Sequence, residues 1–414
     1  MSAGSAPISP LAPASFPELP PVGGVELSTF AGGLRYQDRD DLMLASFPFG
    51  ATVAGVFTTS LCTSAPVDWC KSLLSRGTAA AVVCNAGNAN AFTGAAGDRS
   101  AELTARVVGQ LLGASHDNVY LASTGVIGEP MPNDLLDIAL PRLVLGSEPS
   151  NETRWAAAAN AIRTTDTFAK GSSAAVEGLD ANVVGIAKGS GMIAPNMATM
   201  LGFVFTDVGA SAEVLQHCLG PSVTRSYNSI TVDSDTSTSD TVLLFATGAA
   251  GNELITKVDD PRVPALAAAV HKVNEDLARQ IVRDGEGATK FVEVTVTGAA
   301  SNDAARTIAL AIGNSPLVKT ALAASDANWG RIVMAVGKAG EKASRDDLMI
   351  WIGPEQVTAN GMVSPTYDED AATRHLQQDE VEIKVDVGVG DGHATIWGCD
   401  LTHGYIDINA SYRS

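Results

Sequence analysis

The feature that most constrains the fold is an alternation of two kinds of segment along almost the whole chain. Short runs rich in Val, Ile, Phe and Thr alternate with longer Ala/Leu-rich runs of helical period. This alternation favours an α/β architecture, which we expect to have layered sheets between helices. We expect strands at residues 52–58, 79–84, 118–122, 183–187, 200–206, 241–247, 291–297, 348–352, 381–387 and 394–397. We expect helices at residues 99–112, 134–143, 153–164, 212–219, 263–283, 303–312 and 368–377.

The pattern also indicates where the chain divides. Its 414 residues predict two or three domains. The clearest boundary follows the expected helix 263–283, because strand and helix signals start again after the turn Asp284–Gly287. We therefore expect two domains, over residues 25–283 and 284–414. Residues 1–24 are rich in Ala, Pro and Ser, without a basic start or a long apolar core, which predicts a disordered leader rather than a signal peptide.

Composition excludes several classes of partner. The net charge of −19 disfavours nucleic acid, which is bound by basic patches. No apolar stretch approaches the ~20 residues of a membrane span. The five cysteines form no CxxC pair, and the six histidines show no metal-ligand spacing. We therefore expect a cytoplasmic protein without a metal, in which Asp207, Asp233, Asp235 and Asp240 serve as caps and turn residues.

The segment Gly185–Leu201 carries the most specific chemical signal. Three glycines and Pro195 precede Ala198-Thr199, and the apolar run 200–205 follows. Thr199 would thus lie where a shaped loop enters a buried strand. Attack of its hydroxyl on the Ala198 carbonyl would cut the chain and leave an α-amine of pKa about 8, able to act as a base for that hydroxyl. From spacing alone, the pattern favours an ordinary glycine-rich loop before a core strand.

Sequence blocks from about residue 50 to the C-terminus alter that interpretation. In order along the chain, these are Ala54–Thr59, Asn85–Asn90, Ala122–Gly128, Thr164–Phe168, Thr231–Thr238, Ile281–Lys290, Asn328–Arg331 and Trp397–Asp400. Each block is weak alone, but together they resemble the ornithine acetyltransferase (glutamate N-acetyltransferase) family of arginine biosynthesis. Ser234, Ser239, Ala327 and His403-Gly404 depart from the residues expected for that family.

The resemblance implies a reaction. The chain would cut itself between Ala198 and Thr199, within the first domain, into α and β chains that stay intertwined. Thr199 would then take an acetyl group from N2-acetylornithine as an ester and pass it to glutamate. No cofactor is implied, and the use of acetyl-CoA as a further acetyl donor stays open. The resemblance also implies a dimer of αβ units or a larger oligomer.

The resemblance assigns the oxyanion hole to Thr124 and Gly125. A hydroxyl and an unhindered backbone N–H suit a developing oxyanion, although Ser-Thr-Gly is also an ordinary turn after a strand. Lys188 is assigned to substrate binding, where its ammonium would pair with a carboxylate. We add the hypothesis that Lys188 lowers the pKa of the Thr199 amine by like-charge repulsion.

The remaining assigned substrate contacts are Thr165, Glu286, Asn409 and Ser414, together with Thr199 itself. From the sequence alone, Thr165 fits a polar cluster at a helix end as well as it fits a substrate contact. Glu286 likewise fits an exposed turn. Chain ends generally fray, but the family folds its C-terminus over the substrate, and the alternation at residues 405–408 predicts a final strand. The smaller domain would thereby complete the site.

Two other functions remain open at this stage. An aminopeptidase or amidase with the same N-terminal nucleophile would pass the acyl group to water. A catalytically silent homologue would bind amino acids and never cut its own chain.

Overall fold

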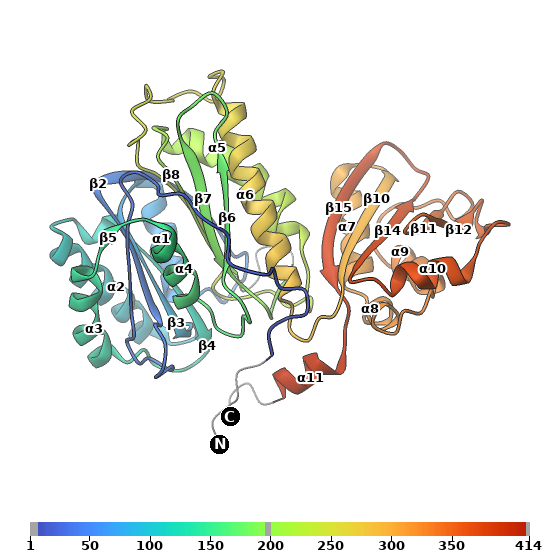
Figure 1. Ribbon diagram of the computed structural model, residues 1–414, viewed down its shortest axis with the longest axis horizontal. Helices are drawn as coiled ribbons and strands as arrows, with labels where there is room; N and C mark the ends of the chain where they lie inside the picture. Colours follow the sequence, from blue (N-terminus) through green and yellow to red (C-terminus); the bar gives the residue numbers. More distant parts are fainter. Residues whose placement is uncertain (1–6, 195–199, 411–414) are drawn as a thin grey trace.

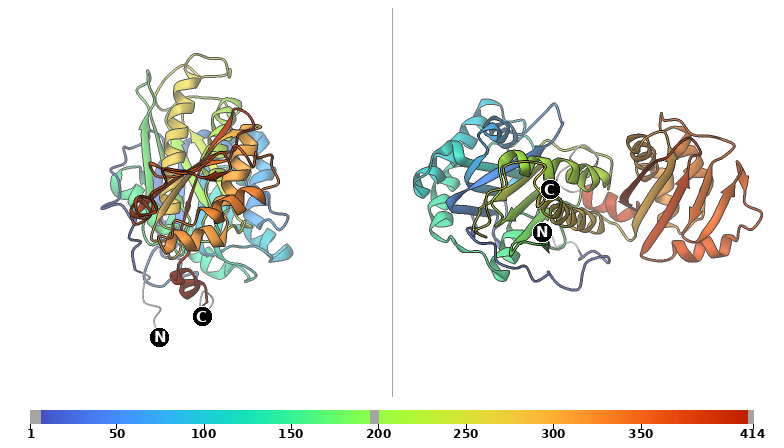
Figure 2. Two further views of the ribbon diagram at one scale, coloured as in Figure 1. Left: turned by 90° about the vertical axis from the view of Figure 1, so that its right-hand side faces the viewer. Right: turned by 90° about the horizontal axis from the view of Figure 1, so that it is seen from above.

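The computed structural model describes residues 7–194 and 200–410, which form two α/β units side by side along the long axis (Figures 1 and 2). The first sheet has the order β4-β3-β2-β9-β8-β7-β6, with β1 paired to β2 and β5 paired to β1. Its strands are β1 (Glu26–Phe30), β2 (Leu42–Phe57), β3 (Thr78–Asn88), β4 (Val119–Val126), β5 (Glu148–Pro149), β6 (Lys170–Ala175), β7 (Asn182–Lys188), β8 (Leu201–Thr206) and β9 (Thr241–Ala246).

Helices cover both faces of this sheet. The sheet is apolar on both sides, because successive residues of a strand point to opposite faces: in β9, Leu243 and Phe245 belong to one core, Val242 and Leu244 to the other. The first core is covered by α1 (Ala65–Leu73), α2 (Gly94–Leu112), α3 (Asn133–Leu145) and α4 (Glu152–Ala161), and the second by α5 (Ala212–Arg225) and α6 (Val263–Arg283). Short 3-10 turns span Leu74–Arg76, His116–Asn118 and Tyr227–Ser229.

The second unit is a smaller sheet with helices packed on it. Its strand order is β13-β12-β11-β14-β10-β15, and it encloses a third core. The strands are β10 (Phe291–Ala299), β11 (Met349–Ile352), β12 (Glu355–Ala359), β13 (Met362–Val363), β14 (Glu380–Asp386) and β15 (Gly392–Cys399). The helices are α7 (Asn302–Gly313), α8 (Pro316–Ala323), α9 (Trp329–Gly337) and α10 (Glu369–Leu376). The boundary expected after residue 283 falls between α6 and β10.

The sheet places both sides of the expected cut in one layer. Strand β7 pairs antiparallel with β8, with Lys188 opposite Leu201, and β8 pairs parallel with β9. A break within residues 195–199 would therefore leave β8 hydrogen-bonded to a strand from the preceding chain. Separating the two chains would expose the edges of two central strands.

Three expectations about local structure are wrong. Residues 7–24 are not a disordered leader, because Leu11, Leu19 and Val22 are buried against the first unit. The helix expected at residues 99–112 begins five residues earlier, because α2 starts at Gly94 after Thr93. Residues 405–408 belong to helix α11 (His403–Asn409) rather than to a strand, because Thr402 accepts a hydrogen bond from Gly404 N and caps a helical turn there.

Among the described residues, no helix is long and apolar enough to cross a membrane.

Candidate active site

A cavity of about 290 Å³ lies where β4, β7 and the turn after α6 meet the C-terminal helix α11. Every described residue that the sequence assigns to the site lines it, namely Thr124, Gly125, Thr165, Lys188, Glu286 and Asn409. The remaining lining residues are Ala89, Val126, Ile127, Thr164, Gly191, Met192, Ser237, Thr238 and Ser239. Ala198, Thr199 and Ser414 lie outside the described residues. The cavity thus collects residues from both units of the protein.

A larger open cleft, of about 850 Å³, lies elsewhere on the first unit near Phe49, Leu111 and Leu254. None of the predicted site residues lines it. The smaller cavity is the better candidate, because several polar side chains converge on it and its ionisable groups have shifted pKa values.

Thr124 and Gly125 lie within β4, which runs on to Val126, and not in a turn after a strand. Gly125 adopts φ +130°, and a Cβ there would come within 2.3 Å of the Gly87 carbonyl carbon on β3. Only glycine is compatible with this close approach of two backbones. The close fit of β3 against β4 therefore fixes the backbone at the predicted oxyanion site.

Lys188 ends β7, and its side chain is buried beside Thr124. Its Nζ donates to Thr124 Oγ1 at 3.1 Å. A hydroxyl that accepts from an ammonium keeps its own O–H as a donor for another group. Burial lowers the pKa of Lys188, although the Asp166 carboxylate opposes that effect. The lysine expected to be in the site is thus in contact with the residue predicted to stabilise the oxyanion.

Glu286 supplies a carboxylate to the cavity wall. Its side chain is nearly buried and accepts a hydrogen bond from Asn409 Nδ2 at 2.7 Å. Burial raises the pKa of Glu286, while hydrogen bonds from Asn409 and Thr165 lower it less strongly. A Cβ on Gly191 would come within 2.4 Å of the Glu286 carboxyl group. The carboxylate therefore occupies space that only a glycine at position 191 leaves free.

The C-terminal helix is tied to this wall. Thr402 Oγ1 donates to the Gly287 carbonyl at 2.6 Å, and Tyr405 Oη donates to Asp233 Oδ2 at 3.3 Å. These contacts hold helix α11 against the cavity wall and bring Asn409 to Glu286.

Asp233 and Asp240 hold the two ends of the segment around the predicted nucleophile. Asp233 accepts from Met192 N at 2.6 Å and Ile193 N at 2.8 Å, and Met192 adopts a left-handed φ of +56°. Asp240 Oδ1 accepts from Met200 N at 3.0 Å. Asp240 is fully buried, which raises its pKa well above the usual range, and its Oδ2 has no hydrogen-bond partner among the described residues. Both carboxylates therefore bind backbone N–H groups next to the predicted nucleophile.

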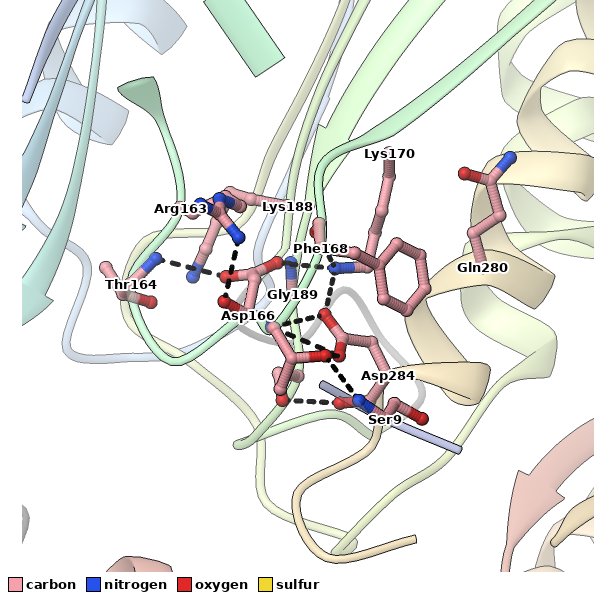
Figure 3. A network of polar contacts seen from close by, with 12 residues as sticks. Ser9, Arg163, Thr164, Asp166, Phe168, Lys170, Lys188, Gly189, Gln280 and Asp284 are labelled. Carbon is pink, nitrogen blue, oxygen red and sulfur yellow. Dashed lines mark hydrogen bonds and ion pairs between the residues drawn. The ribbon is translucent and has the colours of Figure 1, made fainter. Parts of the chain in front are cut away.

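Two features of the site were not predicted from the sequence. The loop Ser237–Ser239 lines the cavity, although its block was noted only as a resemblance. Ser239 is one of the departures from the family pattern, so that change falls in the cavity wall. Asp166 was noted only within the block Thr164–Phe168, but it belongs to a buried ionic cluster with Lys170 and Asp284 (Figure 3). Within the described residues, no cluster of three or more His, Cys, Asp or Glu side chains is placed to hold a metal ion.

Comparisons with known proteins agree with the resemblance. Residues 26–414 match the ArgJ family. The arginine biosynthesis bifunctional protein ArgJ of Agrobacterium fabrum is 51% identical over 99% of this chain and 100% of its own length. The protein of the same name from Gluconobacter oxydans is 52% identical over 99% of this chain and 96% of its own. A crystal structure of the ArgJ protein from Bacillus halodurans is 43% identical, covers 51% of this chain and 98% of that chain, and superposes with a TM-score of 0.49.

Proposed function

The chain belongs to the ArgJ family, and we propose that it is a self-processing glutamate N-acetyltransferase of arginine biosynthesis. It moves an acetyl group from N2-acetylornithine to glutamate through an ester on Thr199. One observation carries the proposal: the described site residues predicted from the sequence line a single cavity. That cavity lies beside Lys188 and Met192, on the stretch that leads to Thr199.

The proposed first step makes the nucleophile. The Thr199 hydroxyl attacks the Ala198 carbonyl, and the peptide bond breaks with release of the Thr199 α-amine. An ester between Ala198 and the hydroxyl forms on the way and is hydrolysed by water. The freed amine then takes a proton from the hydroxyl, as in other N-terminal nucleophiles.

Acetyl transfer then follows in two half-reactions. The Thr199 oxygen attacks the acetyl carbonyl, and the oxyanion accepts hydrogen bonds from Thr124 O–H and Gly125 N–H. Collapse of the adduct breaks the amide bond, and the proton held by the Thr199 amine passes to the departing nitrogen of ornithine. The α-amine of glutamate attacks the ester in the reverse sense and leaves as N-acetylglutamate.

The cavity has a group for each charge of these amino acids. The Lys188 ammonium suits a substrate carboxylate, and the Glu286 carboxylate with Asn409 suits an amine. No cofactor is needed for this chemistry. Because the relatives are named bifunctional, we include a second activity in the proposal, with acetyl-CoA as the acetyl donor to glutamate.

The proposal extends to assembly and location. The pairing of β7 with β8 and of β8 with β9 supports α and β chains that stay together after the cut. We place two or more such αβ pairs in one oligomer, working in the cytoplasm. Size measurement by light scattering, with denaturing mass spectrometry of the same sample, tests the assembly.

Two-substrate kinetics test the reaction. Initial rates at several fixed glutamate concentrations should give parallel double-reciprocal lines against N2-acetylornithine. Intersecting lines would contradict an acetyl-enzyme mechanism. Release of ornithine at an unchanged rate without glutamate would favour an amidase instead. Thr199→Ala should remain one chain and transfer no acetyl, and binding of ornithine by an uncut wild-type chain would favour the silent homologue.

A further inference from the structure

A buried ionic cluster lies next to the residues that line the cavity, and we call Asp166, Lys170 and Asp284 the lysine triad. Lys170 Nζ donates to Asp166 Oδ1 at 2.7 Å and to Asp284 Oδ2 at 2.5 Å (Figure 3). All three side chains are completely buried. One ammonium is thus shared by two carboxylates that come from distant parts of the sequence.

The two carboxylates and the backbone beside them join three segments. Asp166 Oδ1 accepts from Gly189 N at 2.6 Å, and its Oδ2 accepts from Thr164 N at 3.1 Å. Asp284 accepts from Thr167 N at 3.0 Å, and its own carbonyl accepts from Ser190 Oγ at 2.5 Å. The triad therefore ties together the loop after α4, the end of β7 and the turn after α6.

Each of these segments carries a residue of the cavity wall. Thr165 immediately precedes Asp166, Lys188 immediately precedes Gly189, and Glu286 follows Asp284 by two positions. We propose that the lysine triad is the positioning device of the substrate site, setting the three amino-acid-binding side chains relative to one another. This inference rests on the proposed function for the identity of the substrates.

An ionic cluster suits a positioning role better than a purely stabilising one. A buried ion pair is seldom more stable than apolar residues of similar volume, so stability alone gives little reason for it. Its hydrogen bonds are directional, however, and hold three backbones in one arrangement. Burial alone would raise the pKa of Asp166, but the Lys170 and Lys188 ammoniums keep it below the usual range. Burial lowers the pKa of Lys188, and the Asp166 carboxylate partly offsets this lowering.

Lys170→Met tests the inference, because it keeps the aliphatic stem and removes only the ammonium. We expect complete self-cleavage, a KM for N2-acetylornithine raised by about 10- to 100-fold, and a kcat changed by less than about threefold. The increase in KM should become larger as the pH rises, because the two carboxylates left without the ammonium ionise and repel each other. Lys290→Met is the matched control: its ammonium donates to Ser325 Oγ at 2.6 Å, and Lys290 does not line the cavity.

A paired removal of charge separates positioning from simple destabilisation. The double variant Lys170→Met/Asp284→Asn removes one positive and one negative charge together. Its KM should therefore be lower than that of Lys170→Met by about threefold or more. Asp284→Asn alone keeps a side-chain oxygen for Thr167 N and provides the test if Lys170→Met does not fold. We expect a smaller KM increase in this single variant.

The outcomes are distinct from those of the proposed function. If the wild-type protein transfers no acetyl, the proposed function fails, and calorimetric binding of ornithine then replaces KM as the readout for the triad. An unchanged KM or ornithine affinity in Lys170→Met and in Asp284→Asn would overturn the inference, even if both variants melt at lower temperature. The absence of ornithine binding to the wild-type protein would also overturn it.

Discussion

Gly191→Ala is the most informative single substitution in the cavity wall. The new Cβ would lie within 2.4 Å of all three carboxyl atoms of Glu286. Gly191 does not have a positive φ, so alanine adds no backbone strain there. The carboxylate is the far end of a flexible side chain and must move away. Its hydrogen bond from Asn409 Nδ2, at 2.7 Å, should therefore be lost.

The size of the effect follows from that bond. A hydrogen bond to a charged group contributes about 1.5–3 kcal/mol, and about 1.4 kcal/mol corresponds to a factor of ten. We therefore expect kcat/KM for N2-acetylornithine to fall by roughly 10- to 100-fold, mainly through KM. Self-cleavage and the melting temperature should change little, because no buried apolar contact is lost.

Steady-state kinetics of the self-cleaved protein provide the measurement. Gly220→Ala is the matched control, since a Cβ at this position in α5 meets nothing within 4 Å. Its kinetics should equal those of the wild type. A kcat/KM for Gly191→Ala within about twofold of the wild type would show that the position of the Glu286 carboxylate does not matter for the substrate.

Three further predictions concern other residues of the site. Thr124→Val keeps the shape but removes the oxyanion donor, so kcat should fall by about 10²- to 10³-fold, with a smaller change in KM, in the same kinetic assay. Asp240→Ala removes the acceptor of Met200 N and should slow self-cleavage, whereas Asp240→Asn retains an oxygen there and should cleave faster than the alanine variant, as followed by mass against time. Burial raises the pKa of Asp240 above its unfolded value, so its contribution to stability is present below that unfolded pKa and lost as pH rises through the folded one. Thermal melts should therefore show a smaller loss of stability between acidic and neutral pH in Asp240→Asn than in the wild type, and equal losses would contradict this pKa shift.

The α/β architecture could be predicted because the core strands are recognisable from their local sequence. Strands such as β8 and β9 are continuous apolar runs, as expected for strands buried on both faces. Strand β6 was missed because Lys-Gly-Ser-Ser-Ala-Ala has no bulky apolar residue; its place at the sheet edge comes from pairing with β7. Helix α9 was read only as a motif, since it is short and begins Trp-Gly.

The candidate site could be predicted in part. The resemblance identified Thr124, Lys188 and Glu286 and supplied their roles, because the local sequence alone fits an ordinary turn at Thr124 and at Glu286. The lysine triad could not be predicted from the sequence, because Lys170 and Asp284 lie 114 residues apart and no local pattern relates them. Gly191 was equally hidden, since its importance depends on the space that a distant carboxylate occupies.

The decisive measurement for an acetyl-Thr199 intermediate is the mass of the denatured protein, before and after brief mixing with N2-acetylornithine in the absence of glutamate. We expect two chains, residues 1–198 and 199–414, together heavier than the intact chain by one water. After mixing, only the chain that begins at Thr199 should gain the mass of one acetyl group, and glutamate should remove it. A single uncut chain, or a cut protein that releases ornithine without ever carrying the acetyl group, would contradict the account.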